Sequence, residues 1–471
     1  MKKLLIACLL VGGAAHAQPT PEPAPTPAPA PAPVVTPAPV VVPAPVVITE
    51  PAPAPPPPAP KPEDPVPVVG KWSPQLYGFM QLLSIWDSTQ SFTEQAGNGA
   101  IAKDGTYAGD RGRSQISARH SRVGFKLKAP EYDGIKTSAQ VEFDFFGNQP
   151  PGTSEASFYS NATPRLRHYF MKMESSTIDL LFGQTWQLFG WQGFAHPSTV
   201  EIQGVPGQPY GRVQQMRASK TIKSDAWALD LAAAASRPAN RNSVVPDFEA
   251  GVRFTAPKWT AWRTAGATGQ SLDAGGLGVS GIVRQLRVVD FANAAQNDHA
   301  TGWGVSIDAL VPVIGATKEK HAGALTLTGS FVLGQGIADQ FSGLSGGATF
   351  PAPMAPATYT PDIDNGLVTF DTTGALTAIK WQSIIAGAQW YASSKAWLSV
   401  NYSQMSSSNI GSLGLAPGKV FSSSRWADAN VFYDVTPAMR VGAEYEYFMQ
   451  HYEDGAEPVN HRLQLTALYI F

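Results

Sequence analysis

The feature that most constrains this chain is a repeated alternation of apolar and polar side chains with a period of two residues. Between Ile135 and Phe145, aliphatic, aromatic and small residues alternate with Lys, Ser, Gln, Glu and Asp. This period places the two sets on opposite faces of a β-strand. A strand with charges on one face and aromatic rings on the other suits a wall between water and lipid. The preceding segment Arg122–Lys128 repeats the pattern, and Ala129–Gly134 is short enough to join the two segments as a hairpin.

Segments of this kind recur along the chain and predict about 16 strands, an even number as in single-chain bacterial barrels. Besides the hairpin above and a strand at the carboxyl terminus, they are Leu76–Trp86, Arg165–Glu174, Ile178–Gln184, Arg212–Thr221, Ala226–Ser236, Asp247–Thr255, Gly278–Val289, Gly302–Ile314, Gly323–Gly334, Ile384–Ala392, Trp397–Gln404, Trp426–Val435 and Met439–Met449. Short connections alternate with long ones, as expected when turns gather at one rim of a barrel and loops at the other. The segment Ala256–Gly276 lies where a short turn is due, so either this turn carries an insertion or the count is wrong by one hairpin.

Composition agrees with a membrane barrel. Charged residues make up 15% of the chain, against about 25% in a typical soluble domain. After the amino-terminal segment there is no run of 18 apolar residues, so a helical inner-membrane protein is excluded. A soluble β-sandwich is the alternative, but about 400 residues in one unbroken run of hairpins exceed its ordinary size. We therefore predict an all-β fold, a transmembrane antiparallel β-barrel of porin type.

The two ends of the chain point to export and to barrel assembly. Lys2 and Lys3 precede a short apolar stretch and Ala15-His16-Ala17, which predicts a signal peptide over residues 1–17. The terminal strand has an apolar face that runs from Leu463 to Tyr469 and is followed by Phe471. An aromatic-tipped strand of this kind is typical of the closing strand of an outer-membrane barrel. We expect Tyr469 and Phe471 to be the signal that the barrel-assembly machinery recognises in the bacterial outer membrane.

Residues 18–70 form a Pro/Ala-rich segment, and residues 71–471 the predicted barrel. Pro fixes φ and lacks an N–H, so this segment is expected to be a disordered, extended linker in the periplasm. It is either an inert tether or an arm that contacts the cell wall. The single cysteine, Cys8, lies in the signal peptide, so disulfides and thiol catalysis are excluded from the mature chain.

Four short stretches resemble the DcaP-like family of outer-membrane porins. They are Ser121–Lys126, Gln140–Gly147, Arg165–Tyr169 and Gly183–Trp186, and they occur in the family's order and at similar spacing. The resemblance implies a homotrimer of 16-stranded porins that admits small anions, dicarboxylates among them. The long segment Ser88–Ser114 is a candidate latching loop for such a trimer.

A pore is defined by its constriction, and the long connection Thr185–Pro209 stands at the position of the third external loop, which folds inward in porins. An outer loop that packs on the rim is the alternative. A row of Arg in a narrow lumen would concentrate anions and repel cations. Arg212 and Arg217 cannot share a face in a regular strand, so one of them must point elsewhere unless a bulge intervenes. The residues expected to line the pore or its constriction are Arg119, Arg122, Lys126, Glu142, Asp144, Arg165, Arg167, Arg212, Trp186 and Glu201.

These observations favour a porin for passive diffusion of small hydrophilic solutes, with preference for small anionic solutes. A non-selective or weakly cation-preferring pore is the first alternative, because Glu142, Asp144, Glu444 and Glu446 could outweigh the Arg row. A closed structural or adhesive barrel is the second. An outer-membrane enzyme is disfavoured because the sequence offers no catalytic constellation above chance. No cofactor, metal or nucleic acid is expected, and the expected surroundings are outer-membrane lipid and lipopolysaccharide.

Overall fold

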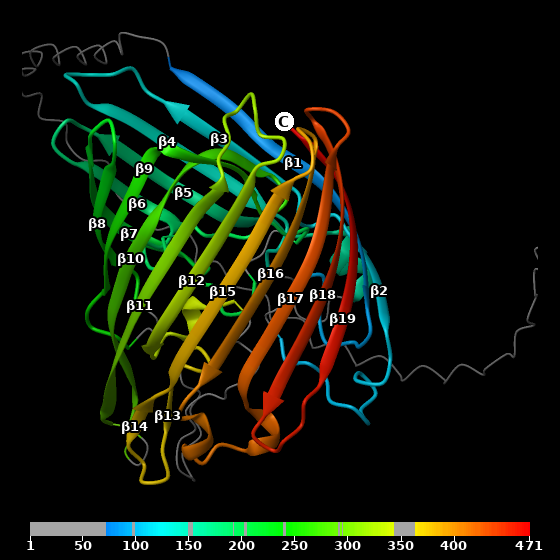
Figure 1. Cartoon of the computed structure of the whole chain (residues 1–471). Helices are drawn as coiled ribbons and strands as arrows, with labels where there is room; N and C mark the ends of the chain where they lie inside the picture. The colour runs from blue at the N-terminus through cyan, green and yellow to red at the C-terminus, as the bar shows by residue number, and fades with distance from the viewer. Residues whose placement is uncertain are drawn as a thin grey trace, which may run out of the picture. The chain divides into compact units, whose positions relative to one another are not determined.

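The computed structural model describes residues 72–96, 99–148, 154–191, 193–201, 205–238, 242–290, 293, 295–342 and 363–471 (Figure 1). The predicted signal peptide, residues 1–17, and the predicted linker, residues 18–70, lie outside these residues. Within the described ranges, none of the helices is long and apolar enough to cross a membrane.

The described chain is built almost entirely from β-strands. They are β1 (Ser73–Asp87), β2 (Arg113–Ser117), β3 (Arg122–Lys128), β4 (Lys136–Asp144), β5 (Arg165–Glu174), β6 (Asp179–Trp186), β7 (Arg212–Lys223), β8 (Ala228–Ser236), β9 (Asp247–Ala265), β10 (Gly269–Val289), β11 (Asn297–Ile314), β12 (Leu325–Gln335), β13 (Val368–Phe370), β14 (Leu376–Ala378), β15 (Lys380–Tyr391), β16 (Ala396–Ser407), β17 (Phe421–Asp434), β18 (Met439–Tyr452) and β19 (Val459–Ile470). The helical segments are α1 (Glu155–Ser160), η1 (Ala338–Gln340), η2 (Ile410–Ser412) and η3 (Pro417–Lys419).

The strands form one closed antiparallel barrel. Its sheet has 17 strands, but β2 and β3 pair with successive parts of β1 and are two halves of one interrupted strand. The described residues therefore make a ring of 16 strands, in which β1 also pairs with β19 and closes the barrel. The predicted fold class is confirmed. Figure 1 shows the carboxyl terminus at the rim of the short turns and β13–β14 at the opposite rim, among the long loops.

Alternation along each strand separates an apolar outer face from a mixed inner face. On β1, Met80, Leu82 and Trp86 are exposed on the outside, whereas Leu83 and Ile85 are buried inside. The same alternation continues around the ring, and exposed Leu, Val, Ile and aromatic side chains cover its outer surface. An apolar belt of this kind is the surface that the hydrocarbon of a bilayer requires.

The segment Ala256–Gly276 is an extension of two existing strands, and the count of strands is correct. β9 has 19 residues and β10 has 21, about twice the 9–11 residues that a strand needs to cross a bilayer. The two strands continue past the rim as one hairpin, which turns at Gly266 with a positive φ of 58°.

The barrel interior is filled on one side. Three clusters of buried apolar residues cover the inner faces of β1 and β10–β19, with Trp381, Trp397 and Trp426 among their largest members. Among the described residues, members of these clusters are absent from β3–β8. There, inward-facing side chains such as Arg122 and Arg212 stay partly exposed. The uncovered part of the lumen therefore lies along the β3–β8 wall.

Candidate constriction zone

The connection between β6 and β7, residues 187–211, is called here the crossing loop, and its described residues 187–191, 193–201 and 205–211 fold into the barrel. At its start, the backbone N–H groups of Leu188 and Phe189 both donate to Glu249 Oε2 on β9, at 2.7 Å each. Farther along, the N–H of Val200 donates to Glu444 Oε2 on β18, at 2.9 Å. Because β9 and β18 lie nearly opposite each other in the ring of strands, the loop crosses the lumen.

Trp191 holds the first half of the crossing loop against the wall. Its indole Nε1 donates to the carbonyl oxygen of Val279 at 3.1 Å. The ring lies on Gly251 of β9 and Gly278 of β10, where an added Cβ would approach it to 2.9 and 2.8 Å. Only glycine leaves room for this contact. Trp191 also has a positive φ of 39°, which costs a non-glycine residue about 1–3 kcal/mol and persists only where its surroundings enforce it.

The second half of the loop is fixed to the far wall by side-chain amides. Asn401 Nδ2 on β16 and Asn430 Nδ2 on β17 both donate to the carbonyl oxygen of Ser198, at 3.1 and 2.8 Å. Gln81 Nε2 on β1 donates to the carbonyl oxygen of Val200 at 3.2 Å. The loop therefore satisfies part of its backbone polar groups on three strands of the interior, as buried backbone requires.

Two of the predicted arginines form a compact ion-pair cluster on β4 and β5. Arg165 binds Asp144 in a bidentate way, at 2.9 and 2.6 Å. Arg167 binds Glu142 at 2.7 Å and Asp144 at 2.9 Å. The register between the strands skips Arg167, which is a β-bulge residue that nevertheless points inward. Two carboxylates thus face two guanidinium groups, and the cluster is electrically balanced.

Three further predicted cations face the same part of the lumen without a carboxylate partner. In the described chain, Arg122, Lys126 and Arg212 form no ion pair. The Arg212 guanidinium lies over the Trp186 ring at 4.9 Å from its centroid. Arg122 lies 5.4 Å from the Phe79 centroid, and the Lys126 ammonium lies 4.7 Å from the centroid of Tyr77. Cation–π contact leaves their N–H groups free to donate.

Arg217 adds another cation to this wall, although Arg212 and Arg217 would lie on opposite faces of a regular strand. Its Nη2 donates to the carbonyl oxygen of Trp186 at 2.6 Å. It follows the alternation of the inner face of β7, whereas Arg212 stands at the first residue of that strand, paired with Trp186. Both arginines therefore meet Trp186. We call the inner faces of β3–β7, with Arg122, Lys126, Arg212 and Arg217, the basic wall.

Two predicted pore-lining residues lie away from this space. Arg119 is 4% exposed and pairs with the buried Glu94 at 2.6 Å. Glu201 is 5% exposed and accepts a hydrogen bond from the N–H of Ala96 at 3.1 Å. Burial, reinforced by neighbouring Glu446 and opposed by Arg462, raises the pKa of Glu201 well above its usual range. Both residues are covered by the loop that follows β1, because Arg119 contacts Glu94 and Glu201 contacts Ala96 of this loop.

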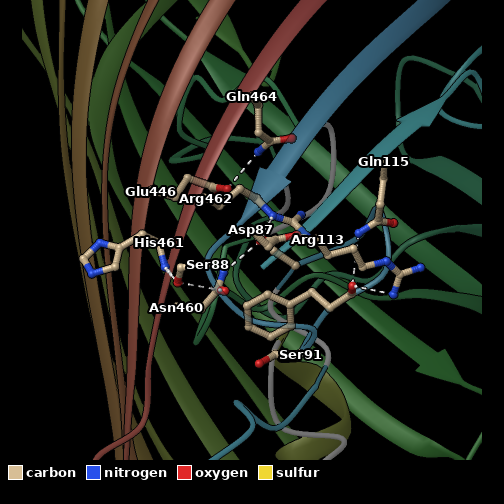
Figure 2. Close-up of polar contacts among 12 residues, drawn as sticks. Asp87, Ser88, Ser91, Arg113, Gln115, Glu446, Asn460, His461, Arg462 and Gln464 are labelled. Atoms are coloured by element: carbon tan, nitrogen blue, oxygen red, sulfur yellow. Dashed lines mark hydrogen bonds and ion pairs between the residues drawn. The ribbon is translucent and has the colours of Figure 1, made fainter. Parts of the chain in front are cut away.

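A buried polar network joins the last strand to the first one (Figure 2). Arg462 on β19 binds Asp87 on β1 through Nε and Nη2, both at 2.8 Å, and both side chains are fully buried. Arg462 also donates to the carbonyl oxygen of Thr93 at 2.7 Å. On the same inner face, Gln464 Nε2 donates to Glu446 Oε2 at 2.7 Å. One guanidinium thus joins β19 to β1 and to Thr93 of the following loop.

Arg462 was not among the predicted site residues. The alternation of the terminal strand contains the signal, because Arg462 falls on the face opposite Leu463 and Leu465. Trp191, which positions the crossing loop, carries no comparable signal in the sequence, since its contacts come from glycines about 60 and 90 residues away. In the described ranges, the side chains of His, Cys, Asp and Glu form no group of three that could hold a metal ion.

No protein-family model matches the sequence, and no curated protein matches it. Among solved structures, the chain is similar to the outer membrane channel DcaP of Acinetobacter baumannii, at 16% identity and a TM-score of 0.62, over 85% of this chain and 97% of that one. It is also similar to an anion-selective porin from Comamonas acidovorans, at 10% identity and a TM-score of 0.47, over 85% and 100% of the two chains. OmpT of Vibrio cholerae in its trimer form aligns at 11% identity and a TM-score of 0.48, over 85% and 100%.

These likenesses concern the fold, and the likeness to DcaP agrees with the family that the four sequence stretches resemble. The predicted localisation in the bacterial outer membrane is confirmed. A closed barrel of 16 strands over the described residues, an apolar outer belt and an inward-folded loop lead to one conclusion. The chain is an outer-membrane β-barrel that shares the fold of the outer membrane channel DcaP.

Proposed function

We propose that the protein lets small anionic solutes, small carboxylates and dicarboxylates among them, diffuse across the outer membrane along the basic wall. The observation that carries the proposal is the difference between two sides of the lumen. Among the described residues, no member of the apolar clusters lies on β3–β7, where Arg122, Lys126, Arg212 and Arg217 keep exposed surface, whereas inward-facing residues of β15–β19 are mostly buried beneath apolar clusters and loops. A hydrated solute therefore meets mainly the side chains of β3–β7.

The charges on the two sides support anion preference over the cation-preferring alternative. Glu142 and Asp144 are balanced by Arg165 and Arg167. The carboxylates of the opposite wall, Glu444 and Glu446, are 1% and 3% exposed and accept hydrogen bonds from protein groups. Cations without a carboxylate partner remain on the basic wall. Their field attracts anions into a water-filled passage and repels cations.

The dicarboxylate class follows from the resemblance to DcaP-like porins and fits the presence of several cations on the wall. Arg122, Arg212 and Arg217 present three guanidinium groups, each with donors that match a carboxylate. A solute with two carboxylates could contact two of them in succession. Repeated moderate contacts favour passage, whereas one tight site would trap the solute.

Assembly and partners form the second part of the proposal. We infer a homotrimer in a membrane of lipid and lipopolysaccharide, delivered by the barrel-assembly machinery through Tyr469 and Phe471. Both aromatic side chains are exposed on the outer face of the last strand, which keeps them accessible to a receptor. The Pro/Ala arm remains a candidate contact with the cell wall.

Uptake by protein-containing vesicles tests the transport proposal. Labelled succinate, putrescine and glucose are supplied to vesicles with and without the purified protein. We expect succinate to enter faster than putrescine. Equal entry of both charged solutes would contradict anion preference, and entry of none of the three would favour the closed structural or adhesive barrel.

A further inference from the structure

The extension of β9 and β10 bends into the barrel, and residues 259–273 are called here the hairpin tip. The bend has a local cause. Ala256 pairs with Gly275 and Thr260 with Ala274, so three residues of β9, Pro257 among them, have no partner on β10. An irregularity of this kind bends a hairpin, and Pro257 offers no N–H to restore the ladder. Gly275 permits the bend, because an added Cβ would lie 2.5 Å from Trp259 and from Pro312.

The hairpin tip is anchored to the far wall of the lumen. Arg440 Nη1 on β18 donates to the carbonyl oxygen of Ala267 at 2.6 Å. The N–H of Thr264 donates to Gln389 Oε1 on β15 at 2.9 Å, and the Thr264 hydroxyl is 2.7 Å from that of Tyr391. Ala267 is fully buried in the apolar cluster that contains Trp397. The hairpin thus crosses the interior from β9–β10 to β15–β18.

The hairpin tip also binds the crossing loop, chiefly through hydrogen bonds from Arg263. Its Nη1 donates to the carbonyl oxygen of His196 at 3.0 Å, and its Nη2 donates to that of Gly193. Its Nε binds Asp273 within the hairpin at 2.7 Å. The N–H of Gly266 adds a bond to the carbonyl oxygen of Pro197 at 2.7 Å. Residues 193–197 of the crossing loop therefore rest on the hairpin tip inside the barrel.

We propose that the hairpin tip is a second constricting element, which enters from the rim of the short turns and holds the crossing loop in place through Arg263. The inference rests on the proposed function, since it supposes an open passage. The two elements meet inside the barrel and form one partition between the filled side and the basic wall. The passage is then limited by both of them, and Arg263 is a positioning residue that acts through the crossing loop.

A shortened hairpin tests the proposal in full-length mature protein. Replacing residues 257–274 by Asn-Gly joins Ala256 to Gly275, which already pair, through a two-residue turn. In planar bilayers we expect single-channel conductance to rise by about twofold, because the passage loses one of its walls. Heat-modifiable electrophoretic mobility reports whether the variant is folded. A folded variant with the conductance of the wild type would overturn the inference.

Point variants keep the question answerable if the shortened barrel does not fold. Arg263→Gln removes the hydrogen bonds to the carbonyl oxygens of Gly193 and His196. Because the crossing loop is then held less firmly, we expect more open-channel noise and brief closures. Asp273→Asn is the matched control, because it removes the ion pair and leaves those two bonds possible. Open-channel noise in Arg263→Gln at the level of the wild type would overturn the positioning role of Arg263. A wild type that never opens would overturn the proposed function itself, which separates the two failures.

Discussion

The guanidinium of Arg212 lies over the indole of Trp186, with 4.9 Å between its central carbon and the ring centroid. Trp186 ends β6 and Arg212 begins β7, and the two residues pair directly across the strands. The ring restrains the cation without neutralising it, so the N–H groups remain available to a passing carboxylate. The arrangement combines a fixed position with moderate affinity, which a diffusion channel needs.

Replacing Trp186 by Leu is expected to weaken the contact of a dicarboxylate with the passage. The loss of a cation–π contact of about 1 kcal/mol corresponds to about fivefold weaker binding. Block of chloride current by added succinate measures the effect. Trp303→Leu, on the outer face of β11, is the matched control and should leave the block unchanged. If succinate blocks the chloride current of Trp186→Leu as strongly as that of the wild type, Trp186 does not contribute to the binding of dicarboxylates.

The Arg462–Asp87 pair is expected to be a main determinant of barrel stability. Removing one partner of a fully buried pair leaves an uncompensated charge, and Arg462→Gln should lower the free energy of unfolding by about 3–5 kcal/mol. Denaturant unfolding followed by electrophoretic mobility measures it. The exposed pair of Lys136 with Glu131 supplies the control, because Lys136→Gln should leave stability almost unchanged. Comparable effects of the two substitutions would contradict this role for Arg462.

The contact of Trp191 with Gly278 is expected to control the order of the crossing loop. Gly278→Ala places a Cβ 2.8 Å from the indole and should displace it. Gly281→Ala on the same strand meets its nearest neighbour only at 3.4 Å and is the control. Chymotrypsin cleaves after aromatic residues, so cleavage within residues 187–211 should be faster in Gly278→Ala alone. Equal rates in both variants would show that the indole does not hold the loop.

The buried carboxyl of Glu201 is expected to make stability depend on pH. Its pKa is raised in the folded protein, chiefly by burial, so the folded state holds this proton more tightly than the unfolded chain. The carboxyl therefore favours folding at low pH, and this contribution is lost as pH rises above the ordinary pKa of Glu. Glu201→Gln should melt at a higher temperature than the wild type at pH 8 and at a similar one at pH 4. A difference of the same size at both pH values would argue against titration of Glu201.

The fold could be predicted from the sequence because barrel walls obey a period of two. The alternation at Lys136–Asp144 and at Val459–Ile470 gives both the strands and their apolar faces. The strands of the segment Ala256–Gly276 could not be predicted in this way. Its residues belong to two strands, but their pairing is irregular and they turn into the barrel, so the contrast between a lipid-facing and a lumen-facing side is lost.

The site could be predicted only in part. Arg165 and Arg167 are two residues apart and meet the same carboxylate, but the bulge at Arg167 is invisible in the sequence. Whether a cation forms an ion pair depends on carboxylates from loops that are distant in the sequence and fold back onto the strands. Arg119 is covered because Glu94 arrives from segment 88–112, whereas Arg122, three residues later, is left without such a partner among the described residues. Contacts of this kind are set by tertiary packing, which alternation does not encode.

The most direct test of the central claim is the reversal potential of the reconstituted channel in a potassium chloride gradient. The wild type should give the sign of an anion-selective pore. Selectivity should fall stepwise in Arg122→Gln and in the double variant with Arg212→Gln. Arg425→Gln removes one positive charge from the outer face of β17 and should change nothing. A reversal potential of cation-selective sign, or one that the two arginines do not affect, would contradict the account.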